Sequence, residues 1–294
     1  MSIKSILVPL DETQRSFNVL ETAFVVARRF GAHVSAVHVQ QNTALSEPFV
    51  YSNLTGALKE AVVRETAQAS ERTASAVKSR FDVACAAAGV RVVDNILGAI
   101  GKTDAEVTAS IEDVDGRMVD VLIERARVSD LTAIASPQLG ENTIRQTPVG
   151  ETLESIMMGS GRPVLIVPRD WVARRCENAV IGWNDSVQAS RALATTLPWL
   201  KTMQSVTLVL SRARAERADM VQGYLSTHGI EANIVILNRG ELDSGAALLE
   251  RCRDVSADFL VVGGYSRARP RQLFFGGVTR HLIKHTDIVT VMVH

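Results

Sequence analysis

The residues best suited to chemistry lie near the end of the 294-residue chain, between an apolar run and a helical pattern. Gly263 and Gly264 follow the apolar run, and Gly276 and Gly277 precede the helical pattern. A helix N-terminus offers unpaired N–H groups and the positive end of its dipole, and glycine lets backbone approach an anion without a Cβ in the way. This arrangement is typical of a phosphate-binding loop.

Three arginines, Arg267, Arg269 and Arg271, lie between the two glycine pairs. A guanidinium can bind a phosphate through two parallel hydrogen bonds, but the same side chain on a solvated loop would contribute little. The sequence leaves both roles open.

Other kinds of chemistry have less support. His281 and His285 lie four residues apart on an expected helix and could share a metal ion, but no third ligand is evident nearby. The Walker A pattern is missing, and with it the lysine that contacts β- and γ-phosphates. The spacing of residues suggests no nucleophile–base pair and no carboxylate pair. A main role in hydrolysis is therefore disfavoured, while slow ATP hydrolysis stays open.

The composition points to a cytoplasmic protein. Basic and acidic residues balance at 32 each, so the chain lacks the basic excess of a general nucleic-acid binder. The three cysteines, Cys85, Cys176 and Cys252, are far apart and suggest neither a disulfide framework nor a zinc site. The first apolar run is too short for a signal peptide, and no run is long enough for a membrane span.

The elements that must position the glycine segment alternate between strand and helix, which predicts parallel α/β architecture. In the first half we expect strands at residues 5–10, 33–39, 90–97, 131–136 and 163–167, and helices at 16–30, 56–88, 105–127 and 149–158.

The pattern restarts after Pro168. Strands are expected at 179–183, 205–210, 232–237, 259–262 and 288–293, with helices at 186–197, 220–227 and 245–253. Asn184 then takes the position of Asp11, directly after the first strand. We therefore expect two domains, 1–168 and 178–294, joined by residues 169–177.

The repeated order and the glycine segment resemble the universal stress protein family in its tandem form. The family's adenine-nucleotide signature is Gly, two residues, Gly, nine residues, Gly and a small residue. Gly263, Ser266, Gly276 and Gly277 take these places, with serine replacing the second glycine. The serine hydroxyl could itself donate to a phosphate oxygen.

The resemblance implies two doubly wound five-stranded parallel sheets with strand order 3-2-1-4-5. It also implies that the halves pack as an intramolecular pseudo-dimer through their last strands, 163–167 and 290–293.

The resemblance also implies a site in the second half, where the strand order reverses. Adenine would lie by the ends of the first two strands, ribose by the first glycine pair, and phosphates at the helix start. The expected binding residues are Trp183, Asn184, Leu210, Gly263, Gly264, Ser266, Arg267, Gly276, Gly277, Val278 and Thr279. Trp183 could equally belong to the core, and Asp11 and Asn184 could simply be turn formers or N-caps.

The first half departs from this pattern. After its fourth strand Glu151 stands where Gly277 stands in the second copy. A carboxylate at a helix start already interacts with the dipole and would repel a phosphate. We therefore expect the first site to be empty or degenerate.

These observations predict a cytoplasmic stress-response protein that binds ATP, ADP or AMP in its C-terminal domain. Nucleotide binding would order residues 264–275 and so change a surface that an unknown protein partner recognises. The alternatives are a protein-interaction module without a nucleotide, supported by Ser266 and the altered first half, and a weak nucleotide hydrolase. Neither nucleic acid nor a membrane is expected as a partner, and a homodimer remains open.

Overall fold

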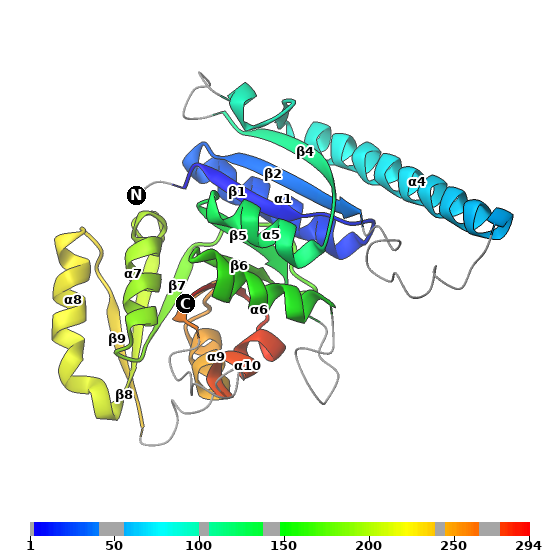
Figure 1. Ribbon diagram of the computed structural model, residues 1–294. Coiled ribbons are helices and arrows are strands. Elements are labelled where there is room, and N and C mark those ends of the chain that lie inside the picture. Colours follow the sequence, from blue (N-terminus) through cyan, green and yellow to red (C-terminus); the bar gives the residue numbers. More distant parts are fainter. Residues whose placement is uncertain (1–2, 41–55, 100–105, 138–147, 239–244, 265–276) are drawn as a thin grey trace. The chain divides into compact units, whose positions relative to one another are not determined.

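A computed structural model of the chain describes residues 3–40, 56–99, 106–137, 148–238, 245–264 and 277–294 (Figure 1). The chain divides into two compact units, Ile3–Asp130 and Leu131–His294. Both units are α/β, with strands and helices alternating along the chain.

The unit Ile3–Asp130 has a parallel sheet in the order β3-β4-β2-β1. Its strands are β1 (Ser5–Pro9), β2 (His33–Gln40), β3 (Arg91–Val92) and β4 (Thr108–Asp115). Its helices are α1 (Gln14–Phe30), α4 (Gly56–Ala88), α5 (Met118–Arg127) and the short 3-10 helix η1 (Ile96–Ala99).

The third strand of this half lies later in the chain than the sequence predicted. Residues 105–127 were expected to be helical, but Thr108–Asp115 forms β4, which pairs with β2 along all eight residues. The expected strand at 90–97 shrinks to the two residues of β3 at the edge. The cause is tertiary, because the buried end of β4 packs in the sheet while acidic residues further along find partners on neighbouring elements.

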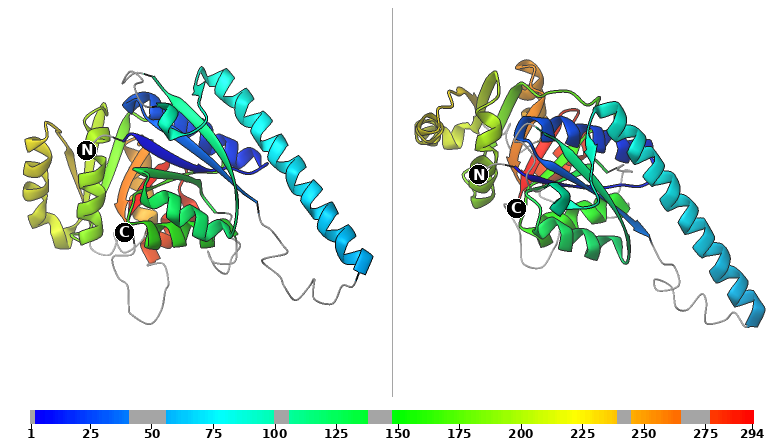
Figure 2. Two further views of the ribbon diagram at one scale, coloured as in Figure 1. Left: turned by 45° about the horizontal axis from the view of Figure 1, so that its top comes forward. Right: turned by 90° about the horizontal axis from the view of Figure 1, so that it is seen from above.

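Helix α4 is long and is buried only over part of its length. Its carboxyl-terminal half buries Val77, Phe81 and Cys85, and Gly89 with φ 62° follows its end. A residue with positive φ just after a helix is a common helix terminator. In Figure 2 the amino-terminal part of α4 extends beyond the strands of its own unit. No helix within the described ranges is both long and apolar enough to cross a membrane.

The unit Leu131–His294 has strands in the order β5-β6-β11-β10-β7-β8-β9. They are β5 (Leu131–Ala135), β6 (Val164–Val167), β7 (Asn178–Trp183), β8 (Ser205–Ser211), β9 (Asn233–Leu237), β10 (Phe259–Gly263) and β11 (Val289–Val293). All neighbours are parallel except β6 and β11, which pair antiparallel with Val291 opposite Leu165.

This order confirms two expectations. The second half alone gives β9-β8-β7-β10-β11, which is the order 3-2-1-4-5. The last strands of the two halves also pair, as β6 and β11. Because of this pairing, β5 and β6 belong to the same compact unit as the second half, although they end the first repeat. The boundaries 1–168 and 178–294 remain a prediction from the repeated sequence.

Helices cover the sheet of this unit between successive strands. They are α6 (Pro148–Ser160), α7 (Val187–Leu200), the 3-10 helix η3 (Arg212–Arg217), α8 (Ala218–Thr227), α9 (Gly245–Asp254) and α10 (Gly277–His285). Trp199 of α7 packs on Phe259 of β10 with ring centroids 4.4 Å apart. This contact fixes α7 against the strand that leads into the glycine segment.

Candidate functional site

The candidate site lies at the carboxyl ends of β7 and β10, which are parallel neighbours with Gly182 opposite Val262. In the sheet, β8 lies next to β7 on one side and β10 lies next to it on the other. The strand order therefore reverses between β7 and β10, and crevices at such points are the usual ligand sites of doubly wound sheets.

Gly263, the first residue of the motif, is required by packing. A Cβ atom added there would lie 2.4 Å from the Ala189 backbone N and 2.6 Å from the Gln188 backbone C, both in the first turn of α7. Backbone atoms cannot yield as a flexible side chain can. Glycine therefore lets the helix after β7 approach the end of β10.

Gly264 is already engaged by its own chain. Its N–H donates to the carbonyl oxygen of Val293 at 2.8 Å, and an added Cβ would lie 2.7 Å from Met157 Cε of α6. Packing and pairing thus account for this glycine without a ligand, and its expected contact with ribose stays a prediction.

Trp183 and Leu210 lie opposite each other across β7 and β8, and both are buried. Trp183 is 7% exposed, so its ring belongs largely to the protein interior. Its Nε1 has no hydrogen-bond acceptor among the described residues. The ring thus fits the core interpretation, but its N–H group is left unexplained by the core.

Asn184 helps to build the turn into α7. Its Oδ1 accepts a hydrogen bond from Ser186 Oγ at 2.6 Å, and Ser186 Oγ accepts one from the Ala189 N–H at 3.1 Å as the N-cap. Between them Asp185 has φ 58°, and its carboxylate lies 3.8 Å from Arg217 Nε of η3. The turn-forming alternative for Asn184 is therefore confirmed, and direct ligand contact stays a prediction.

The helix that would receive phosphates, α10, begins at Gly277. Gly277 is exposed and an added Cβ would meet nothing within 4 Å; Val278 is half-buried and Thr279 buried. The first turn contains no acidic residue. Ser266, Arg267, Arg269, Arg271 and Gly276 lie outside the described residues.

In the first half, the loop after β1 is held by hydrogen bonds and contacts within the chain. Asp11 Oδ1 accepts from both the N–H and the Oγ1 of Thr13. Arg80 of α4 donates to the Glu12 carbonyl oxygen and, at 3.0 Å, to Gln14 Oε1, and its guanidinium lies 3.9 Å from the centre of the Phe17 ring. Arg80 could not be found from the sequence, because nothing in the local pattern links it to a loop almost seventy residues earlier.

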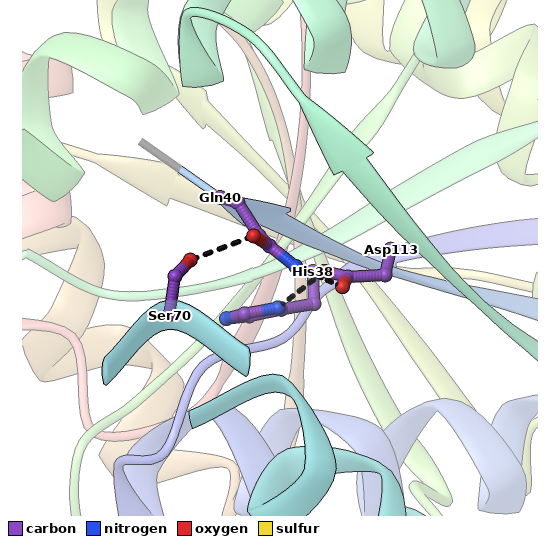
Figure 3. Close-up of polar contacts among 4 residues, drawn as sticks. All are labelled: His38, Gln40, Ser70 and Asp113. Carbon is purple, nitrogen blue, oxygen red and sulfur yellow. Dashed lines mark hydrogen bonds and ion pairs between the residues drawn. The ribbon is translucent and has the colours of Figure 1, made fainter. Parts of the chain in front are cut away.

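A second polar group lies at the carboxyl ends of β2 and β4. Figure 3 shows a chain of contacts from Ser70 of α4 through Gln40 and Asp113 to His38. Ser70 Oγ donates to Gln40 Oε1 at 2.6 Å, Gln40 Nε2 donates to Asp113, and His38 Nδ1 lies 2.7 Å from Asp113 Oδ1. This chain joins α4 to β2, and His38 is 7% exposed, as expected for a packed histidine.

The helix start of the first half contrasts with α10, because Glu151 lies in the first turn of α6. A carboxylate there occupies the positive end of the helix dipole. The expectation that the first site is empty or degenerate stays a prediction.

His281 and His285 stack on α10 with ring centroids 4.4 Å apart. Burial, and then the neighbouring His285 and Lys284 charges, lower the pKa of His281. Within the described ranges, no group of three His, Cys, Asp or Glu side chains could hold a metal ion.

The topology defines a doubly wound α/β protein. A profile of the Universal stress protein family matches residues 2–168. A search of curated proteins found no match. Since more than half of the sequence is matched by the profile, the chain belongs to the Universal stress protein family.

Solved structures extend the likeness of fold over both halves. A universal stress protein from Archaeoglobus fulgidus DSM 4304 is 16% identical with a TM-score of 0.71, covering 99% of this chain and 96% of its own. A functionally unknown protein from Pseudomonas aeruginosa PAO1 is 13% identical with a TM-score of 0.54, covering 99% and 92%. At these identities the likeness shows the fold alone.

Proposed function

We propose that this chain is a cytoplasmic stress-response protein that binds one adenine nucleotide in its second half. The observation that carries the proposal is the reversal of strand order between β7 and β10, with α10 following β10 through the glycine-rich segment. The close approach of Gly263 to the first turn of α7 supports it, because it occurs at the carboxyl end of β10.

In this proposal the base lies beside Trp183, Asn184 and Leu210, at the ends of β7 and β8. The ribose lies beside Gly263 and Gly264. The phosphates meet the start of α10 at Gly277, Val278 and Thr279, with Ser266, Arg267 and Gly276 contributing from the preceding segment. The absence of an acidic residue from the first turn of α10 supports the placement of an anion there.

The role is regulatory rather than catalytic. Family membership supports a function in stress response, and the sequence offers no Walker A lysine to stabilise a transferred phosphoryl group. A bound nucleotide would then act by changing the surface that a protein partner recognises. This requires that the nucleotide bind one conformation of the protein more tightly than the other.

The first experiment is calorimetric titration of the purified chain with ATP, ADP and AMP, after denaturation and chromatography to detect nucleotide carried through purification. We expect about one nucleotide per chain. If no nucleotide binds and none is carried through, the proposal is wrong, and the interaction module without nucleotide becomes the better description.

A substitution at the start of α10 tests the position of the phosphates. Gly277→Glu introduces the acidic residue that α6 has in its first turn, and the open space around Gly277 lets the fold accept it. We expect about tenfold weaker ATP binding, because the new charge opposes the phosphates and neutralises the dipole. Gly277→Gln, which has the same shape without the charge, should bind ATP within about twofold of the wild type.

A further inference from the structure

Trp183 carries a buried hydrogen-bond donor with nothing to donate to. Its Nε1 is one of three buried side-chain polar atoms without a partner among the described residues; the others are Thr132 Oγ1 and Trp171 Nε1. An indole nitrogen can only donate, and leaving a buried donor unpaired costs free energy that proteins usually avoid. An unpaired donor of this kind calls for an explanation such as a ligand.

Trp183 is the last residue of β7, at the carboxyl end of the strand where the candidate site lies. Gly182 and Val262 are opposite each other, and a Cβ atom added at Gly182 would lie 2.9 Å from Leu248 Cδ2 of α9. Side chains alternate along a strand, so Trp183 faces the opposite side of the sheet, the side of α7. The next residue of β10 is Gly263, whose side-chain position also faces α7. Trp183 therefore lies beside Gly263 of the neighbouring strand, a residue that has no side chain.

The neighbouring strands indicate which part of a nucleotide is close. Trp183 pairs with Leu210 at the end of β8, on the side away from β11. The phosphates in the proposed function lie at α10, which connects β10 to β11. Trp183 thus lies on the opposite side of the crevice from the phosphates, where the base would be.

We infer that Trp183 Nε1–H donates a hydrogen bond to a ring nitrogen of the bound purine, which would make this residue a determinant of base recognition. The inference rests on the proposed function. The ring itself stays packed in the interior, and only its N–H group serves the ligand. Without ligand the donor stays unpaired, so its contribution is realised only on binding.

The test is to remove the N–H while keeping the shape of the ring. Replacing Trp183 with benzothienylalanine exchanges the indole N–H for sulfur in a ring of nearly the same size. Calorimetry with ATP should show about tenfold weaker binding, the effect of one lost hydrogen bond to a buried partner. Inorganic tripolyphosphate, which has no base, should bind the substituted and unsubstituted proteins equally.

Two further variants keep the test sharp. Trp183→Phe also removes the donor, and we expect the same tenfold loss. Trp171→Phe is the matched control, because Trp171 also has a buried, unpaired Nε1 but packs against Arg174 in the segment between β6 and β7. It should bind ATP like the wild type.

The outcomes separate the two proposals. If the wild type binds no nucleotide, the proposed function is wrong and the inference falls with it. If the wild type binds ATP and the benzothienylalanine protein binds it equally well, the proposed function stands and the role of the Trp183 donor is overturned. A loss shared by ATP and tripolyphosphate would also overturn it, because it would show general damage to the site.

Discussion

The loop after the first strand is capped in the same way in both halves, by Thr13 and by Ser186, but it contacts different elements beyond the cap. In the first half, Asp11 accepts hydrogen bonds from Thr13, while Arg80 of α4 holds Glu12 and Gln14. In the second half, Asn184 and Ser186 cap α7, and the buried N–H of Trp183 remains without an acceptor among the described residues. The polar groups of the first loop are paired within the protein, whereas the Trp183 donor just before the second loop has no acceptor among the described residues.

The additional contacts in the first half depend on the length of one helix. The helix after the second strand is α4 with 33 residues in the first half, and α8 with 10 residues in the second. The longer helix can bring Arg80 to the loop after β1 and Ser70 to the end of β2. A half whose polar groups are paired internally gains little from a ligand, because binding must first break those pairs.

The largest effect is expected at Gly263, where glycine lets α7 approach the end of β10. Gly263→Ala should lower the free energy of unfolding by about 3 kcal/mol, because the new methyl group would collide with the backbone of α7. Urea denaturation followed by circular dichroism would measure it. Gly277→Ala is the control and should change the unfolding free energy by less than about 0.5 kcal/mol. Equal stability of the two variants would show that α7 does not approach β10 this closely.

Cysteine labelling should distinguish the halves almost as strongly. Cys85 of α4 and Cys252 of α9 are both buried, and burial raises the pKa of each thiol to about 12, with smaller contributions from Asp82 and Asp287 respectively. Both thiols should therefore be neutral and slow to react with a maleimide. With ATP at about 100 times its Kd, labelling of Cys252 should slow by up to about 100-fold while that of Cys85 is unchanged.

Peptide mass spectrometry after quenching would follow each cysteine separately. Equal protection of Cys85 and Cys252 by ATP would mean that ligand stabilises the halves together. That result would contradict the proposal that only the second half binds nucleotide.

A smaller effect is expected at Arg80. Arg80→Ala should lower the free energy of unfolding by about 1.5 kcal/mol, because it removes two hydrogen bonds and the contact with Phe17. The number of ATP molecules bound per chain should stay at one. Arg72→Ala, at an exposed position on the same helix, is the matched control for helix propensity and charge. Appearance of a second ATP site in Arg80→Ala would show that Arg80 blocks a functional pocket.

The sequence predicted most of the second half because its signals are local. Short apolar runs became β7, β8 and β10, and the order 3-2-1-4-5 followed from the family resemblance. In the first half, residues 105–127 were expected to be helical, but Thr108–Asp115 forms a strand. This strand depends on pairing with β2 and on the contact of Asp113 with His38, neither of which a local pattern contains.

The candidate site could likewise be predicted only where its signals are local in sequence. Gly263 and Gly277 could be found from their spacing, but the reason for Gly263 is its distance from Ala189, which lies more than seventy residues earlier. Arg80 and the unpaired Trp183 nitrogen could not be found at all, because partners distant in sequence, or the lack of one, define them.

Because the two repeats share one chain, the pairing of β6 with β11 does not depend on protein concentration. Each strand is fully buried and, apart from Thr290 of β11, apolar, and each ends its own repeat. If the repeats were separate chains, this pairing would require two molecules to associate. Dilution would then leave the edges of β6 and β11 unpaired and open to pairing with other chains. Here residues 169–177 join the repeats, so the partner edge is always present at high effective concentration. Cleaving the chain in that segment would turn a folding step into a binding equilibrium.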